Sequence, residues 1–460
     1  MSLLDFAAQT LELARARAGA AAEAEVEVTR EAVALTRFAN SFIHQNVAGD
    51  TTTVRLTVHS GGRTAAASTT KVSADGLGDL VDRVVESVRS APADPGWPGL
   101  TPAAPLAGEP GFDPDTAAAT PDQRAARVRA FVDAAGLETA GYCRTLHWAR
   151  AYANSAGQSA TMRTSEAAMD GIARRDGSDG VARLASVALR DIDGSLLGAR
   201  AGAKARAGAG AVELPPGRFE VVLEPCAVAD LLTNFSVAGF NGRAHAERRS
   251  FAEIGSAQFD PSVTLADDPL APGHPGIAFD GQGTPKRRLV LVDAGVTTAV
   301  THDRRTARLA GATSTGHGVP GGGSPFGAFA LTLGLAPGRA DVIGAGETAE
   351  WVDPAAAQLV PGIERGLLVT DLHYTRVLDP KTLVVTGLTR NGVWLIEDGK
   401  VTTPVQNFRF TQSYPRALEP GQVRGIGPVA VLMPSSWGIA WWRAPALHLA
   451  SWNFTGGASG

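Results

Sequence analysis

Cysteine is scarce in this sequence: only Cys143 and Cys226 occur in 460 residues. Two cysteines cannot form a four-thiolate metal site, and nothing in their placement indicates a secreted disulfide scaffold. Long hydrophobic runs are missing, because no apolar stretch approaches the roughly 20 residues that span a bilayer. The N-terminal segment carries Asp5 and Glu12 and has no continuous apolar core, unlike a signal peptide. We therefore expect a soluble, cytoplasmic protein without membrane contact.

A strong excess of charge of either sign is also missing. The chain has 42 Lys and Arg against 46 Asp and Glu, which gives a net charge of −4. A nucleic-acid partner usually demands a clear basic excess, so we expect no nucleic-acid binding. Hydrophobic residues make up 44% and charged residues 19%, a balance that argues against wholesale disorder. A chain of this length is too long for one ordinary core, so more than one domain is expected.

The first half of the chain alternates between helical and strand periodicity, which predicts an N-terminal α/β-type domain over residues 1–213. Apolar residues recur at helical spacing from Leu77 to Ser90. Thr120 and Gln123 form a capping box for another helix, which Gly136 ends. The other expected elements are an opening helix, strands around residues 26–28 and 54–58, a hairpin turn at 60–63, a return strand at 64–69 and a helix near 191–207.

A proline- and glycine-containing step, Leu214–Gly217, predicts the start of a C-terminal domain over residues 214–460. This domain is expected to begin with a strand at Phe219–Leu223 and a helix-like segment at Ala227–Gly239. Short strands and glycine or proline turns dominate after that, which is typical of a β-rich domain of barrel or sandwich type. The predicted fold class is therefore α+β, with the two kinds of domain in this order.

Two dipeptides in the second half, Asn391-Gly392 and Asp398-Gly399, tolerate the positive φ angles that type I′ hairpin turns require. They predict an antiparallel meander of three strands, at residues 383–388, 393–397 and 400–405.

The histidine positions argue against a zinc peptidase site. Such a site needs two or three imidazoles or carboxylates that converge on the ion, and a base that activates the bound water. On a helix, these ligands must lie about one turn apart. No two of the nine histidines fall within five residues of each other; they stand at positions 44, 59, 147, 245, 274, 302, 317, 373 and 448.

Several segments resemble the TldD/PmbA (TldE) family of metallopeptidase-related proteins, over roughly residues 30 to 415. The segments are 37–45, 221–239, 249–251, 267–269, 283–288, 307–317 and 366–414. In that family, one subunit carries an HExxxH zinc motif and a paralogous subunit lacks it. The similarity favours the TldE/PmbA type, which lacks the motif.

The resemblance also places the motif in this chain. In catalytic members, a strand and two apolar residues precede HExxxH, as Val221–Leu223 and Leu231–Leu232 do here. Thr233, Asn234 and Ala238 then stand at the positions of the first histidine, the glutamate and the second histidine. Catalytic members also supply a cysteine thiolate from near the C-terminus, whereas both cysteines here come before residue 230. The resemblance therefore implies no catalytic residue, no metal ligand and no cofactor in this chain.

Four side chains are candidates for substrate binding: Arg243, His245, His317 and Asn391. His245 stands in a basic cluster with Arg243, Arg248 and Arg249, which would bind a carboxylate such as a peptide C-terminus. A solvated loop or a subunit contact is the alternative interpretation of that cluster.

The resemblance implies a non-catalytic, pseudo-peptidase subunit of a TldD/TldE-type metalloprotease complex. Its partner would be an HExxxH-bearing, zinc-holding paralogue, and together they would enclose a chamber for unfolded or modified peptides. The chain alone would then be inactive. Two alternatives remain open: an independent hydrolase with a relocated active site that uses His245, His302 or His317, and a homo-oligomeric peptide-binding module such as a homodimer.

Overall fold

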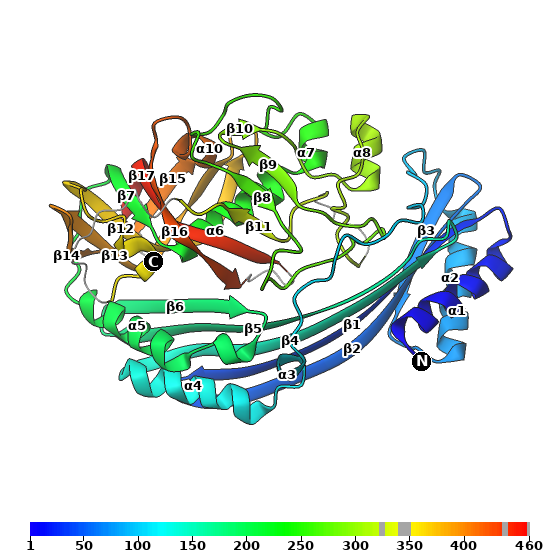
Figure 1. The fold of residues 1–460 in the computed structure, drawn as a ribbon, viewed down its shortest axis with the longest axis horizontal. Coiled ribbons are helices and arrows are strands. Elements are labelled where there is room, and N and C mark those ends of the chain that lie inside the picture. Colours follow the sequence, from blue (N-terminus) through cyan, green and yellow to red (C-terminus); the bar gives the residue numbers. More distant parts are fainter. Residues whose placement is uncertain (322–326, 339–350, 435–439, 458–460) are drawn as a thin grey trace.

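A six-stranded antiparallel sheet with very long strands forms the base of the molecule (Figure 1). The computed structural model describes residues 1–321, 327–338, 351–434 and 440–457. The strand order is β3-β2-β1-β4-β5-β6. The bounds are β1 Glu23–Ala39, β2 Phe42–Ser60, β3 Arg63–Thr69, β4 Glu138–Asn154, β5 Ser159–Arg175 and β6 Ser178–Ser186. This sheet and its helices confirm the predicted α+β character of the N-terminal half.

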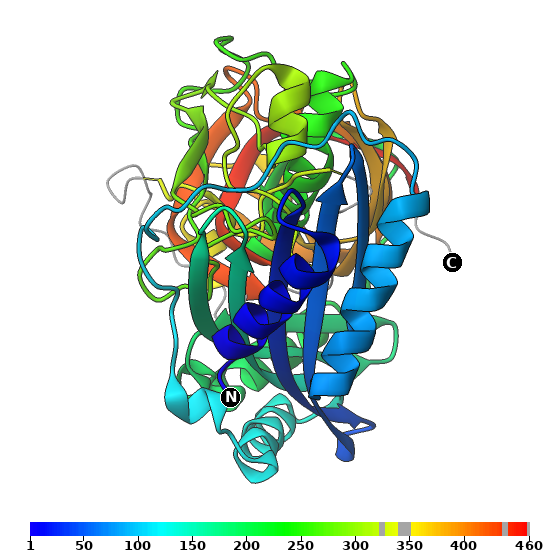
Figure 2. The same ribbon diagram turned by 90° about the vertical axis from the view of Figure 1, so that its right-hand side faces the viewer.

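Two pairs of helices cover the outer face of this sheet, one pair at each end (Figures 1 and 2). The expected capping box of Thr120 and Gln123 is present, and Gly136 ends that helix in the left-handed conformation. The predicted hairpin between β2 and β3 also forms, with positive φ at Gly61 and Gly62. The helices are α1 Leu3–Ala18 and α2 Ala74–Ser90 at one end, and α4 Pro121–Ala135 and α5 Gly194–Ala207 at the other, with the short α3 Pro114–Ala117 between them.

The C-terminal half lies on the opposite face of the sheet and is rich in strands, as predicted (Figure 1). Five strands form a closed ring in the order β7-β12-β13-β15-β17, because β17 also pairs with β7. This ring makes the domain barrel-like. Its strands are β7 Gly217–Leu223, β12 Arg365–Asp379, β13 Val384–Glu397, β15 Phe408–Ser413 and β17 Trp441–Gly457.

Shorter elements extend the ring. Helix α6 Pro225–Asn234 follows β7 directly and buries its apolar face in the core of this half. Further strands are β8 Leu265–Asp267, β9 Leu289–Asp293, β10 Val296–Thr297, β11 Leu333–Leu335, β14 Lys400–Val405 and β16 Val423–Pro434. Further helices are α7 Gly242–Ala246, α8 Arg304–Ala310, α9 Pro354–Ala357 and α10 Tyr414–Ala417. No helix of the described residues is long and apolar enough to cross a bilayer.

One predicted hairpin is wrong. Asp398 and Gly399 do form the expected turn between β13 and β14, with φ of 48° and 73°. Asn391 and Gly392, however, lie inside the continuous strand β13, where two residues face only Thr370 of β12. They have the positive φ that was expected, 59° and 123°, but they use it in a β-bulge. A bulge and a type I′ turn demand the same backbone region, so the dipeptide alone does not distinguish them.

Buried charged contacts tie the two halves together. Lys204 on α5 forms an ion pair with Glu224, which precedes α6, and both side chains are 2% exposed. Arg150 on β4 is paired with Glu27 at 2.6 Å and also donates to the backbone carbonyl of Phe279 at 2.8 Å. Breaking one partner of such a buried pair is strongly destabilising. These contacts therefore hold the barrel-like half in a defined position on the sheet.

Candidate functional site

The segment that the sequence analysis aligned with the HExxxH motif lies at the end of α6. Pro225 occupies the first turn of this helix, where its missing N–H costs nothing. Thr233 and Asn234 stand in the last turn, and Ala238 lies in the π-helical turn Phe235–Gly239 that follows. Such π-helical turns are rare and are often found at functional sites.

A cavity of about 620 Å³ opens beside this segment. Thr233, Asn234 and Ala238 all line it. A second wall comes from β12, between Asp371 and Val377, and the floor comes from β4, β5 and β6 of the N-terminal sheet. The cavity thus lies between the two halves of the chain.

Asp230, one helical turn before Asn234, is the most perturbed acid of this cavity. Its Oδ1 accepts a hydrogen bond from the Thr375 hydroxyl at 2.6 Å, and its Oδ2 accepts one from the Tyr414 hydroxyl at 2.7 Å. The Asn234 amide donates to Oδ2 at 3.2 Å. Burial raises the pKa of Asp230 to about 6, because these hydrogen bonds offset only part of the desolvation and the nearby Asp371 adds to the shift.

Arg183 lines the cavity and is shared by two carboxylates. Arg183 on β6 donates through Nε to Asp170 and through Nη1 to Asp371 of β12, both at 2.8 Å. Burial alone would lower the pKa of Arg183, but the two carboxylates outweigh it and raise that pKa. The amide of Asn391 also donates to Asp371, at 2.9 Å. This network joins the N-terminal sheet to the barrel at the cavity.

The residues present do not fit a zinc ion. The Thr233 hydroxyl donates to the carbonyl of Ala229 at 2.8 Å, and Ala238 has no donor atom. Cys226 Sγ lies 3.8 Å from Met433 Sδ, and burial raises the pKa of this thiol to about 12. Within the described residues, no three His, Cys, Asp or Glu side chains are placed to hold a metal ion.

His373 is the only histidine among the residues that line the cavity. Its Nε2 lies 2.8 Å from Arg390 Nη1, and burial together with this arginine lowers its pKa. A neutral imidazole held by a guanidinium is a hydrogen-bond acceptor at physiological pH. His373 therefore adds a polar group to the rim of the cavity without adding charge.

Three of the four predicted substrate-binding residues lie elsewhere. Arg243 and His245 are on α7, where Arg243 pairs with Glu247 at 2.9 Å and His245 is half-buried. His317 is fully buried and lies 3.0 Å from Asp267. None of the three lines the cavity beside Thr233. Their role in substrate binding remains a prediction.

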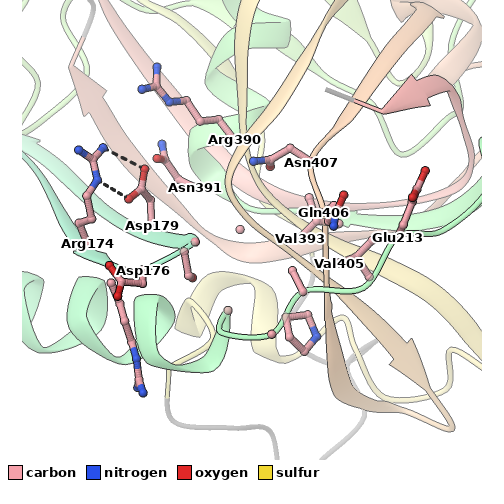
Figure 3. Close-up of a pocket in the computed structure, with 18 of the residues that line it drawn as sticks. Arg174, Asp176, Asp179, Glu213, Arg390, Asn391, Val393, Val405, Gln406 and Asn407 are labelled. Carbon is pink, nitrogen blue, oxygen red and sulfur yellow. Dashed lines mark hydrogen bonds and ion pairs between the residues drawn. The ribbon is translucent and has the colours of Figure 1, made fainter. Parts of the chain in front are cut away.

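Asn391, the fourth, lines a second cavity of about 1110 Å³ (Figure 3). One wall of this cavity comes from the turn between β5 and β6, where Arg174 pairs with Asp179 at 2.8 Å. The opposite wall carries Arg390 and Asn407. Asn391 is 4% exposed, and its hydrogen bond to Asp371 connects this cavity with the one beside α6.

Asp230, Asp371 and Arg183 were missed by the sequence analysis. The available signal was a single acid, Asp230, within the otherwise apolar stretch 225–232, spaced one turn from Asn234. Asp371 and Arg183 gave no signal of their own, because their pairing joins strands that are 188 residues apart in the chain.

Comparisons with known proteins agree with this architecture. A family model described as the PmbA/TldA metallopeptidase C-terminal domain matches residues 216–452. TldE from Thermococcus kodakarensis superposes with a TM-score of 0.81 at 17% identity, covering 97% of this chain and 99% of that one. A search among curated proteins returned no match.

Two further solved structures have the same fold. Both are described as candidate modulators of DNA gyrase. The one from Thermotoga maritima has a TM-score of 0.80 at 16% identity and covers 99% of this chain and 100% of its own. The one from Bacteroides thetaiotaomicron has a TM-score of 0.77 at 18% identity, with 98% of each chain covered. These likenesses show the fold, and the family model matches more than half of the sequence: the chain belongs to the PmbA/TldD metallopeptidase family.

Proposed function

We propose that this chain is a non-catalytic subunit that binds unfolded or modified peptides for a zinc-bearing, HExxxH-containing paralogue in the cytoplasm. The observation that carries the proposal is the cavity beside α6. It is present where the family motif lies, yet the motif positions hold Thr233, Asn234 and Ala238. A hydroxyl, an amide and a methyl group cannot hold zinc or activate water, whereas they are compatible with peptide binding.

An open strand edge supports the peptide-binding part of this proposal. Strand β12 pairs with β7 only over Gly366–Val369, whereas it pairs with β13 along most of its length. Within the described residues, its other edge is therefore unpaired from Thr370 to Asp379. Six residues of this stretch line the cavity. An extended peptide can add to such an edge through backbone hydrogen bonds, which requires no particular sequence.

A second open edge supports the subunit partnership. Strand β3 covers β2 only from Val54 to Ser60, so Phe42–Thr53 pair on one side only, with β1, among the described residues. This stretch exposes apolar side chains: Phe42 is 58% exposed and Val47 is 44% exposed. A long free edge with apolar groups is a template for pairing with another chain. We propose that it contacts the paralogue, or a second copy of this chain in the homodimeric alternative.

The alternative of a relocated hydrolase site has one observation in its favour. The Thr315 hydroxyl lies 2.8 Å from His317 Nδ1, and His317 Nε2 lies 3.0 Å from Asp267, which is a hydroxyl–imidazole–carboxylate order. However, His317 and Asp267 are fully buried, and Lys286 neutralises Asp267 at 3.1 Å. Thr315 also exchanges hydrogen bonds with the backbone of His302. This group therefore fits a structural network better than an active site.

The proposal is tested with the full-length chain alone and mixed with an HExxxH-bearing paralogue. We expect labelled unstructured peptides to bind to the chain alone, and hydrolysis to require the paralogue. Peptides N-methylated at single positions should lose affinity at every second residue, because a strand pairs through alternate N–H groups. Chelator-sensitive hydrolysis by this chain alone, with one zinc per chain, would refute the non-catalytic role. Hydrolysis by this chain alone that a chelator does not inhibit, and that is lost in a His317→Ala variant that still folds, would favour the relocated site instead.

A further inference from the structure

The cavity beside α6 has an uneven set of charges. Among the described residues, its lining includes three carboxylates, from Asp170, Asp230 and Asp371, and two guanidinium groups. One of these, Arg183, is held by Asp170 and Asp371 together. The lining therefore carries one more acid than base.

The second guanidinium does not balance the remaining acid. Arg376 is exposed, and its guanidinium carbon lies 4.6 Å from the ring centroid of Tyr374. This is a cation–π arrangement at the rim. Tyr374 itself is 66% exposed and has a positive φ of 54°. The strand is bulged at this point, and Arg376 lines the cavity at an exposed position where its guanidinium contacts the Tyr374 ring.

Asp230 is thus the acid without a cation partner. Its hydrogen bonds come from two hydroxyls and one amide, those of Thr375, Tyr414 and Asn234. No ion pair of Asp230 occurs within the part of the chain that the structure describes. Neutral donors stabilise a carboxylate less well than a cation does, and a half-buried carboxylate without a countercharge is costly.

The rest of the lining suits an alkyl chain. Apolar side chains line the same cavity as Asp230, and they come from α6, its π-helical turn, β12, β16 and β17; the group comprises Ala229, Val237, Leu372, Val377, Met433 and Trp442. A lysine places a charged head at the end of an apolar stem, so its stem would contact these side chains. The open edge of β12 forms the same wall and would hold the backbone of that peptide.

We propose that this cavity selects peptides that present an ammonium group to Asp230. The inference rests on the proposed peptide-binding function and adds the chemical class of the peptide. The ammonium group comes from a lysine side chain or from the free N-terminus. Both provide the same donor and charge, and they differ in the apolar stem.

The test uses the full-length chain and short unstructured peptides with a fluorophore at the C-terminus. The central residue is Lys, norleucine or Glu, and each peptide is prepared with a free and with an acetylated N-terminus. Anisotropy titrations give the affinities. We expect the peptides with an ammonium group to bind about tenfold more tightly than acetylated norleucine peptides, as for one charge-assisted hydrogen bond. If the tighter binding is retained when the N-terminus is acetylated, the ammonium group that binds is that of the lysine side chain. If the tighter binding is lost, the group is the free N-terminus.

Asp230→Asn should reduce this tenfold preference to about one, whereas the control Asp79→Asn, on the exposed surface of α2, should keep it. Circular dichroism confirms that both variants fold. Equal binding of the Lys, norleucine and Glu peptides, or a preference that survives in Asp230→Asn, overturns the ammonium inference but leaves peptide binding intact. If none of the peptides binds, the proposed peptide-binding function itself fails and the inference fails with it.

Discussion

Removing the charge of Asp230 is expected to stabilise this protein at neutral pH. The folded structure raises the pKa of Asp230 from an ordinary 3.8 to about 6. A protonated Asp230 therefore stabilises the fold at low pH, and this stabilisation is lost as the pH rises through about 6. Asp230→Asn keeps the size of the side chain but cannot ionise. The variant should thus gain stability over the wild type as the pH increases.

The size of the effect follows from the pKa. Each pKa unit corresponds to about 1.4 kcal/mol, so ionised Asp230 costs up to about 3 kcal/mol at pH 7.5 and about half of that at pH 5. The side chain is half-buried beside an open cavity, and water there reduces these values to about 1–2 kcal/mol at pH 7.5. Asparagine also accepts less well from Thr375 and Tyr414, which costs about 1 kcal/mol at every pH. The difference between the two pH values is therefore the diagnostic quantity.

The assay is thermal unfolding of the wild type, Asp230→Asn and the exposed control Asp79→Asn at pH 5 and pH 7.5. The melting temperature of Asp230→Asn, relative to the wild type, should be about 0.5–1 °C higher at pH 7.5 than at pH 5. Asp79→Asn should show no such difference. A relative melting temperature that is independent of pH, or lower at pH 7.5, would refute the assignment of Asp230 as an uncompensated acid.

Three further substitutions test other parts of the structure. Arg183→Gln removes the cation that the buried Asp371 shares with the partly exposed Asp170, and should lower the free energy of unfolding by about 2 kcal/mol in urea titrations. Gly392→Val should lower the melting temperature strongly, because φ is 123° and a Cβ there would lie 2.1 Å from Trp394. Val47→Lys, on the open edge of β2, should weaken association with a paralogue in size-exclusion chromatography without lowering the melting temperature; unchanged association would exclude this edge as the contact.

Local signals in the sequence predicted much of the fold. The helix after Thr120 and the turn at Asp398–Gly399 depend on neighbouring residues alone, and both formed as expected. The turn predicted at Asn391 and Gly392 was wrong. These two residues form a β-bulge, because their conformation depends on the pairing with β12, where both face Thr370. The ring of five strands likewise closes through pairing of β17 with β7, which are more than 200 residues apart. Such distant pairing leaves no local trace in the chain.

The candidate site was only partly predictable for the same reason. The family motif identified the cavity through Thr233, because its ligand positions lie within six consecutive residues. The environment of Asp230 could not be predicted from the sequence, because its hydrogen-bond donors are Thr375, 145 residues away, and Tyr414, 184 residues away. An acid in an apolar helical stretch was the only hint. Whether this acid has a cation partner depends on which side chains of the barrel-like half contact it in the folded chain.

The groups around the cavity come from two separate parts of this fold: the segment aligned with the family motif, and the strands that surround it. The three positions aligned with the HExxxH motif all lie on α6 and its π-helical turn, and they hold a hydroxyl, an amide and a methyl group, which are not zinc ligands. The cavity itself is formed by the ring of strands and the N-terminal sheet, which the Arg183 network joins. The three motif-aligned positions are not members of that network. The open edge of β12 and Asp230 also line the cavity. In the proposed function, these are the groups that hold the peptide.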